Sequence, residues 1–345
     1  MEKPSLDKAK AGAMRFNTDS LVLEIYDGNQ WVQVVADSPE LLTNGTRGVR
    51  VGGQTPSTPY GINTIDFFNM STTGNASDFG DLNVYRASSG QGFASRTRGF
   101  AASGYNSSLG GYIDNIDFFT IASQGNASDF GDMVDNKQGI GALASTTRGV
   151  INTGSDASSA VNVIQYVVMA TTGNARDFGD LSVARTYARG LASKTRGFGC
   201  GGYAPNSSNA SNVIDFITIS TLGNSSDFGD VSYGAKGSLL TSSNATRGII
   251  CGGSPENIDT INFVTLATLG DSLEFGDLTR SRRDGAAMTS PTRFVAAGGA
   301  NSSSPAGTEV IEFIAIATLG NGTDFGDLTE TVFETAGLSN GHGGL

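Results

Sequence analysis

The sequence is poor in the residues that most often carry out chemistry. Its 345 residues include one histidine, one tryptophan and two cysteines. A Ser-His-Asp or Cys-His arrangement would depend on His342, which lies in the glycine-rich tail "NGHGGL", a poor place to orient a base. Copper and other soft-metal centres need several histidine or cysteine ligands, and the sequence offers no such cluster. We therefore expect no enzyme activity, no metal and no cofactor.

Basic residues and apolar runs are also scarce. The chain has 22 Lys and Arg against 33 Asp and Glu, a net charge of −11, which argues against a nucleic-acid surface and against binding to an anionic membrane. No apolar run approaches the roughly 20 residues that span a bilayer, and the start "MEKPSLDKAK" lacks the apolar core of a secretory signal. We expect no nucleic-acid partner and no membrane insertion.

The two cysteines are interpreted as small core residues rather than as a disulfide. Cys200 and Cys251 stand at neighbouring positions of one phrase in adjacent repeats. Their Cα atoms are expected to lie beyond the roughly 7 Å that a disulfide spans.

What the sequence has in quantity is repetition. The phrase "TTGNASDFGDL" (72–82) and its close variants occur six times in all, with the aromatic residue at Phe79, Phe130, Phe178, Phe228, Phe275 and Phe325. Two further phrases keep the same spacing, one like "TRGFAASG" and one like "IDFFTI". Six units of about 50 residues therefore cover residues 46 to 340, after a flank of about 45 residues.

Each unit divides into four short strands separated by Gly, Asn, Ser and Asp, as in unit two at 89–95, 98–104, 115–121 and from Ala127 onward. This pattern predicts an all-β fold, a six-bladed β-propeller of four-stranded antiparallel blades. The first unit has no matching first strand before Thr46, but one is present near Glu334–Asn340. We expect this C-terminal strand to complete the first blade and close the ring, with each phrase's Phe filling the gap between blades.

The glycine pairs after the second strand and the aromatic third strand resemble Kelch repeats, over about 85 percent of the chain. The usual fourth-strand Trp is missing, and the Phe of "DFGD" stands in its place. The phrase "TLGNGTDFGDL" resembles Kelch-like repeats of tailed-phage structural proteins. Residues 12–34 read as three short strands, with Trp31 packing them, and resemble a small module of phage tail-fibre proteins.

The resemblance implies a phage virion protein, a tail fibre or surface appendage. Its N-terminal module and linker (1–41) would contact other virion proteins, and its propeller (42–345) would bind a host-surface glycan or receptor. The resemblance also implies a homo-oligomer in the virion. A connector or decoration protein without a ligand remains an alternative. A glycoside hydrolase is a third one, although six equivalent "DFGD" carboxylate pairs look structural rather than catalytic.

Two sets of charged residues recur once in every unit, and we expect them to form charge-assisted hydrogen bonds within or between blades. The arginines are Arg47, Arg98, Arg148, Arg196, Arg247 and Arg293. The acids are Asp78, Asp129, Asp177, Asp227, Glu274 and Asp324.

Variation between the units points to one binding face. The turns between strands one and two and between strands three and four hardly change, whereas the two–three loops and the four–one connections vary. The two–three loops offer tyrosines as rigid anchors, namely Tyr60, Tyr105, Tyr112 and Tyr203. Five of the six four–one connections carry a basic residue that could meet anionic sugars or phosphates, namely Arg86, Lys137, Arg185, Lys236 and Arg282.

Overall fold

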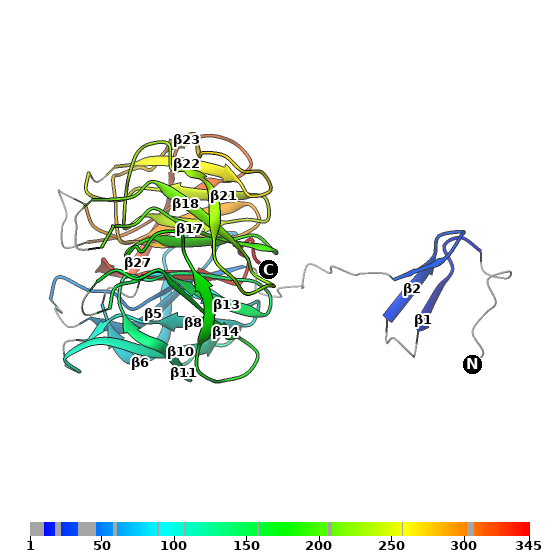
Figure 1. The fold of residues 1–345 in the computed structure, drawn as a ribbon, viewed down its shortest axis with the longest axis horizontal. Coiled ribbons are helices and arrows are strands. Elements are labelled where there is room, and N and C mark those ends of the chain that lie inside the picture. Colours follow the sequence, from blue (N-terminus) through cyan, green and yellow to red (C-terminus); the bar gives the residue numbers. More distant parts are fainter. Residues whose placement is uncertain are drawn as a thin grey trace. The chain divides into compact units, whose positions relative to one another are not determined.

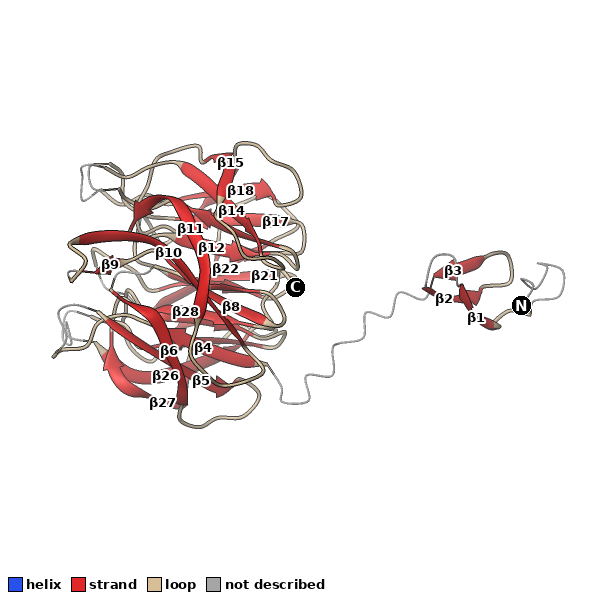
Figure 2. Ribbon diagram, turned by 90° about the horizontal axis from the view of Figure 1, so that it is seen from below, coloured by secondary structure: helices blue, strands red, loops and turns tan. Residues whose placement is uncertain are grey.

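The computed structural model describes residues 10–17, 22–33, 46–57, 61–87, 90–106, 108–156, 159–205, 209–256, 258–301 and 307–345. The chain divides into two compact units, Met1–Thr43 and Asn44–Leu345. The boundary predicted from the sequence, between residues 41 and 42, lies two residues earlier. The described residues form strands and loops only (Figure 2), so they contain no helix long and apolar enough to cross a membrane.

The N-terminal unit is an antiparallel meander of three strands, as predicted. Its strands are β1 (Met14–Asn17), β2 (Val22–Tyr26) and β3 (Trp31–Gln33), in the order β1-β2-β3. The turn after β2 is fixed by the Asp27 carboxylate, which accepts hydrogen bonds from the backbone N–H groups of Asn29 and Gln30. The Trp31 ring lies 5.4 Å from the Tyr26 ring, so it packs this unit as expected.

The described part of the second unit contains six antiparallel sheets (Figure 1), each built on four consecutive strands, with a fifth short strand added to one of them. Sheet 2 consists of β7 (Phe93–Ala94), β8 (Arg98–Ala102), β10 (Gly111–Thr120) and β11 (Ser128–Lys137), and sheet 3 consists of β12 (Gly141–Ala144), β13 (Arg148–Asn152), β14 (Val163–Val168) and β15 (Arg176–Asp180). Sheet 4 consists of β16 (Arg189–Ala192), β17 (Arg196–Cys200), β18 (Val213–Thr218) and β19 (Ser226–Asp230), and sheet 5 consists of β20 (Leu240–Ser243), β21 (Arg247–Cys251), β22 (Thr260–Thr265) and β23 (Leu273–Asp277). Sheet 6 consists of β24 (Ala286–Thr289), β25 (Arg293–Ala297), β26 (Thr308–Ala315) and β27 (Thr323–Val332). A short extra strand, β9 (Tyr105–Asn106), pairs with β10 in the two–three loop of sheet 2.

Sheet 1 is built from both ends of this unit. It consists of β28 (Ala336–Ser339), β4 (Arg47–Val51), β5 (Ile62–Asn69) and β6 (Ser77–Arg86). The predicted pairing of the C-terminal strand is present, because β28 runs antiparallel to β4 with Leu338 opposite Val49. Asn340 adds a side-chain hydrogen bond from the Arg47 backbone N–H at 2.9 Å.

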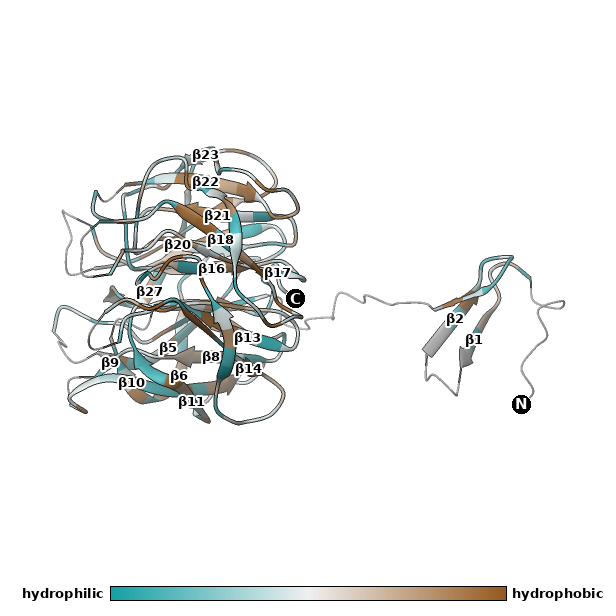
Figure 3. Cartoon of the chain, viewed as in Figure 1, coloured by the Kyte–Doolittle hydropathy of each residue, from teal (hydrophilic) through white to brown (hydrophobic). Residues whose placement is uncertain are grey.

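Apolar side chains fill the spaces between consecutive sheets. The described residues form six hydrophobic clusters, one at each of the interfaces 1–2, 2–3, 3–4, 4–5, 5–6 and 6–1. The Phe of each repeated phrase lies in one of them; Phe79 of sheet 1, for example, packs 5.2 Å from Phe119 of sheet 2. In Figure 3 the hydrophobic colour follows strands such as β21 and β22. The expectation that this Phe fills the gap between sheets is confirmed.

The repeated phrase recurs because each copy bonds to the copy before it. The backbone N–H groups of Gly125 and Ala127 in sheet 2 donate to the carbonyls of Phe79 and Asp81 in sheet 1, both at 2.8 Å. The Asn126 side chain accepts from the Asp81 N–H at 3.1 Å. The same three bonds join sheet 1 to sheet 6, with Gly74, Asn75 and Ala76 in those roles.

The glycine of "FGD" is required by this contact. Gly80, Gly131, Gly179, Gly229, Gly276 and Gly326 have φ between +141° and +156°. A Cβ at any of these positions would lie 2.4 to 2.7 Å from a backbone atom of the next phrase. Both the backbone conformation and the close approach therefore exclude a side chain.

Candidate ligand-binding surface

The two ends of the sheets differ in structure as they do in sequence. At the end of the one–two turns, a side chain accepts a hydrogen bond from the backbone N–H of each repeat arginine at 2.8 to 3.1 Å, and the acceptors are Ser95, Ser145, Ser193, Asn244, Ser290 and Asn340. We call this end the turn face. The opposite end, called the loop face, carries the two–three loops and the four–one connections.

The repeat arginines do not pair with the repeat acids. Each guanidinium stacks over an aromatic residue of its own sheet at 4.6 to 5.1 Å. It also donates to the carbonyl of the residue just after the third strand of the next sheet, at 2.6 to 3.3 Å. The acceptors are Ile121, Met169, Ile219, Leu266, Ile316 and Met70 for Arg47, Arg98, Arg148, Arg196, Arg247 and Arg293. The six acids, Asp78, Asp129, Asp177, Asp227, Glu274 and Asp324, lie exposed on the outer strands. The arginines therefore form the expected charge-assisted hydrogen bonds between sheets, but to carbonyl groups. Within the described residues no ion pair joins the two sets, so the acids are not their partners.

These contacts give the arginines a scaffold role that can be measured. Replacing Arg196 by Ala removes its stacking on Phe216 and its hydrogen bonds to the Leu266 and Ala267 carbonyls. We expect a loss of about 1 to 3 kcal/mol in the free energy of unfolding by urea.

Arg176→Ala is the matched control, because Arg176 is exposed on the outer strand of sheet 3, and it should change stability by less than about 0.5 kcal/mol. Equal losses in the two variants would contradict the role assigned to Arg196.

The five basic residues of the four–one connections are buried and do not line a binding face. Arg86, Lys137, Arg185, Lys236 and Arg282 are each at most 5% exposed. The three arginines form ion pairs with an acid on the third strand of the next sheet: Arg86 with Asp117 at 2.6 Å, Arg185 with Asp215 at 2.5 Å, and Arg282 with Glu312. The expectation that this set meets anionic ligands is therefore wrong, and the three arginines instead join neighbouring sheets.

The residue type on the third strand changes with the basic residue of the preceding four–one connection. Where the connection supplies lysine, the third strand supplies an amide: Gln165 follows Lys137, and Asn262 follows Lys236. Lys137 has one ion pair, to Asp135 at 3.6 Å, and burial lowers its pKa. Lys236 reaches the exposed Glu256 at 2.9 Å.

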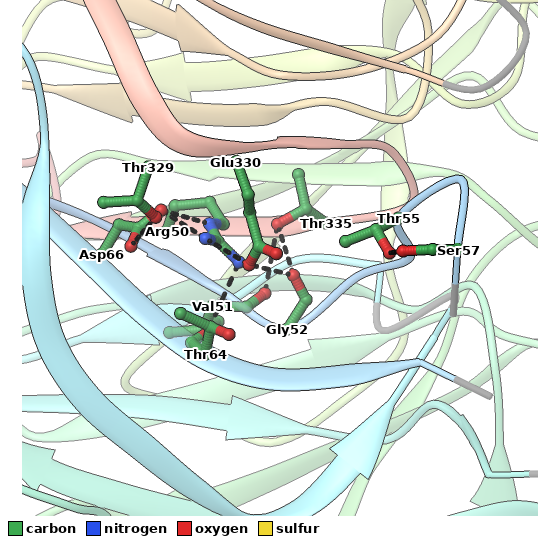
Figure 4. A network of polar contacts seen from close by, with 10 residues as sticks. All are labelled: Arg50, Val51, Gly52, Thr55, Ser57, Thr64, Asp66, Thr329, Glu330 and Thr335. Carbon is green, nitrogen blue, oxygen red and sulfur yellow. Dashed lines mark hydrogen bonds and ion pairs between the residues drawn. The ribbon is translucent and has the colours of Figure 1, made fainter. Parts of the chain in front are cut away.

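At the 6–1 interface the connection holds Val332, and Arg50 takes over the pairing with an acid. Its guanidinium binds Asp66 and lies 3.2 Å from Glu330 of sheet 6 (Figure 4). Thr329 adds a hydrogen bond to Asp66 at 2.6 Å.

The space between the inner strands is filled. Gln91 of sheet 2 donates to the Gly190 and Thr241 carbonyls and accepts from the Ala142 and Gly190 N–H groups, so it spans sheets 3, 4 and 5. The buried Arg189 of sheet 4 faces Asp284, just before β24 of sheet 6, at 3.6 Å. A cavity there, lined by Gln91 and His342 among others, has a volume of about 30 Å³, which is room for a water or two. This cavity is too small to hold a sugar ring.

The tail closes the same space at the turn face. The Gly343 N–H donates to the Ser243 carbonyl at 2.6 Å, and a Cβ on Gly344 would lie 1.8 Å from the Ala144 oxygen. His342 Nε2 lies 2.8 Å from the Ala94 carbonyl, while Nδ1 accepts from the Gly344 N–H, so the proton sits on Nε2. Burial lowers the pKa of His342 to about 4.

This buried histidine predicts a pH-dependent stability. The unfolded pKa is 6.5 and the folded pKa is about 4, so the unfolded chain binds more protons between these values. The contribution of His342 is complete above pH 6.5 and is lost as the pH falls through 4, by about 3 kcal/mol in total. Urea unfolding at pH 7 and pH 4.5 should show a smaller fall for His342→Gln than for the native chain, and equal falls would contradict this assignment.

The predicted tyrosine anchors form two ring pairs on the loop face. Tyr105 and Tyr112 meet edge to face at 5.9 Å, and both are half-buried. Tyr203 meets Tyr187 edge to face at 6.3 Å. Tyr60, the fourth predicted anchor, lies outside the described residues.

Tyr187 was not among the anchors predicted from the sequence, and its backbone conformation explains how its ring comes to lie beside Tyr203. Tyr187, Ser238, Asp284 and Glu334 follow the four–one connections of successive sheets and have φ between +51° and +56°, where Gly139 has +62°. Each such non-glycine residue costs roughly 1 to 2 kcal/mol. Backbone N–H groups of Tyr187, Ser238 and Asp284 donate hydrogen bonds of 2.8 to 3.1 Å to the carbonyls of Gly139, Tyr187 and Ser238, respectively. These bonds link successive four–one connections to one another.

The described residues were also searched for metal-ligand clusters and reactive thiols. Among the described residues no group of three His, Cys, Asp or Glu side chains could hold a metal ion. Cys200 and Cys251 are buried free thiols, as interpreted from the sequence, and burial raises the pKa of Cys200 to about 12. Open grooves of about 500 and 370 Å³ do occur on the turn face, between sheets 4 and 5 and between sheets 2 and 3, and they are lined by the same turn residues in each case.

Comparison with known proteins gives no relative: no protein-family model and no curated protein matches the sequence.

Proposed function

We propose that the six sheets are the blades of a closed, Kelch-like β-propeller that acts as a non-catalytic binding module. Support for the ring comes from the 6–1 interface, whose phrase-to-phrase bonds, arginine contact and apolar cluster repeat those of the other interfaces. The inner strands make contact in the order β28, β7, β12, β16, β20, β24, and β24 contacts β28. Closed architectures of this kind leave only short sheet edges open.

The observation that carries a binding function is the contrast between the two faces. The turn face repeats one hydrogen-bonded turn in every sheet, whereas the loop face holds half-buried tyrosine pairs and strained side chains. Strained residues persist where surrounding structure holds them and often mark functional sites. Rigid aromatic rings next to Ser, Asn and Gly suit recognition of a ligand.

The position of the chain ends supports display of the loop face. β4 begins and β28 ends at the turn face, so the N-terminal unit is joined to the propeller there. In this proposal residues 1–41 attach the protein, and the loop face meets a host-surface glycan or receptor. The virion setting, as a tail fibre or appendage and as a homo-oligomer, rests on the resemblance of the repeats and of the N-terminal unit to phage proteins.

A protein that starts at Leu42 tests this division of labour. Because the second unit has its own core, its melting temperature should stay within a few degrees of the full chain, and host-cell binding should persist. Incorporation into virions should be lost, which co-sedimentation with particles measures.

If the shortened protein still joins particles, attachment lies on the propeller. If only the full chain joins particles and that full chain adsorbs to no cell, the connector alternative replaces the binding function.

A further inference from the structure

The charged residues on the loop face indicate whether its ligand is anionic or neutral. Burial removes the five basic residues of the four–one connections from this surface. On the described two–three loops, the four–one connections and the strand ends beside them, eight acidic and two basic side chains stay at least partly exposed, namely Asp114, Asp135, Asp156, Glu256, Asp259, Glu309, Glu330 and Glu334 against Arg280 and Arg283. Three of these acids pair with buried cations, Asp135 with Lys137, Glu256 with Lys236 and Glu330 with Arg50, and the other five still outnumber the two exposed cations. The face is therefore negative, like the chain as a whole, and it repels polyanions.

Both of the exposed cations are also engaged. Arg283 lies 3.1 Å from Asp284, and Arg280 donates to the Thr308 hydroxyl at 3.2 Å. No described basic cluster remains that could offset the carboxylates of a uronic or sialic acid polymer.

The tyrosine pairs supply a different kind of contact. Tyr105 and Tyr203 occupy equivalent positions, because each pairs with the residue that follows the buried arginine of the preceding connection, Ala87 and Thr186 respectively. Each ring is held by an edge-to-face partner, and Gln138 also donates a hydrogen bond to the Tyr112 hydroxyl at 3.1 Å. Held rings lose little entropy when a ligand covers them.

The two pairs belong to sheets 2 and 4, so sheet 3 lies between them. A ligand that touches both must extend across the loop of sheet 3, where Ser155, Asp156 and Ser159 offer hydroxyl and carboxylate groups. A single sugar ring reaches one pair only. Two linked contacts raise the effective affinity well above that of either alone.

We propose that the loop face binds a neutral, hydroxyl-rich saccharide chain, with Tyr105–Tyr112 and Tyr187–Tyr203 as its two docking points. The C–H faces of uncharged sugar rings pack on tyrosine, and their hydroxyls bond to Ser, Asn and carboxylate groups. This inference rests on the proposed binding function and specifies its ligand class.

An array of immobilised polysaccharides tests the ligand class with the full-length protein. Dextran, mannan, galactan and arabinan serve as neutral probes, and polygalacturonate, polysialic acid and heparin as anionic ones. Binding to a neutral probe, with an affinity that changes less than about twofold between roughly 50 and 500 mM NaCl, is the expected result, because an uncharged ligand is not screened.

Binding to anionic probes alone overturns the ligand class and leaves the binding function standing. Binding to no probe, with adsorption to host cells retained, also overturns the saccharide inference. If adsorption to cells is absent as well, the proposed function fails with it.

Variants then test the docking points on the bound neutral probe. Tyr105→Ala and Tyr203→Ala should each weaken binding at least tenfold at an unchanged melting temperature, and short oligosaccharides should bind far more weakly than the polymer. Tyr85→Ala is the control, because Tyr85 is 55% exposed on β6 and belongs to neither pair. Equal weakening by Tyr85→Ala, or an affinity independent of chain length, overturns the two-point assignment.

Discussion

Deletion of residues 329–345 is expected to destabilise the whole second unit by more than about 5 kcal/mol. The deletion removes β28, which pairs with β4, and the buried side chains of Val332 and Leu338. Loss of one buried leucine alone costs about 2 to 5 kcal/mol, and each lost backbone hydrogen bond adds about 1. It also exposes the edge of β4, which invites aggregation. Thermal unfolding followed by circular dichroism should show a midpoint lower by about 10 °C or more.

A shorter deletion separates the strand from the tail. Removing residues 341–345 leaves β28 in place but eliminates the His342 and Gly343 hydrogen bonds. Its effect should be clearly smaller than that of the longer deletion. A melting temperature within a degree or two of the full chain after the longer deletion would contradict closure of sheet 1 by the C-terminal strand.

The second large effect is expected at Gly229, the glycine of "FGD" in sheet 4. Gly229→Ala should destabilise the protein by more than about 3 kcal/mol, because a Cβ there lies 2.5 Å from the Gly270 carbonyl carbon and φ is +150°. The contact lies between two backbones, so neither side can move without breaking the bond from Gly270 to Phe228.

Gly223→Ala provides a matched control for this substitution. Gly223 has nearly the same φ, +146°, but nothing lies within 4 Å of its added Cβ. Only the conformational cost of roughly 1 to 3 kcal/mol remains there. Urea unfolding of both variants measures the difference, and equal losses would show that the phrase-to-phrase contact is looser than described.

The strands were predictable from sequence because the repeat compares six versions of the same element. The second strand of unit two, expected at 98–104, is observed at Arg98–Ala102. The first strand was predicted too long, since only Phe93 and Ala94 pair. The outer strand, predicted from Ala127 onward, is observed at Ser128–Lys137. Strand ends depend on neighbouring loops, which differ from unit to unit.

The partners of the charged residues were predicted least well from the sequence. Two sets of six opposite charges suggested partners, but recurrence gives no register, and the acids of "DFGD" point outward. The actual partners stand in the third-strand phrase, where Asp117 and Asp215 accompany arginine while Gln165 and Asn262 accompany lysine. That matched variation was visible in the sequence and could have identified the buried pairs. Tyr187 could not have been found in this way, since its place depends on a left-handed turn that the other units fill with Gly, Ser, Asp or Glu.

The most direct test of the account compares the two faces in one binding measurement. Labelled full-length protein, Tyr105→Ala/Tyr203→Ala and Arg96→Ala/Lys194→Ala are titrated onto host cells, after equal melting temperatures have been verified. Arg96 and Lys194 lie in one–two turns on the turn face. The account predicts that the tyrosine variant loses at least tenfold in affinity while the turn-face variant binds like the native protein. Loss of binding in the turn-face variant alone would contradict it.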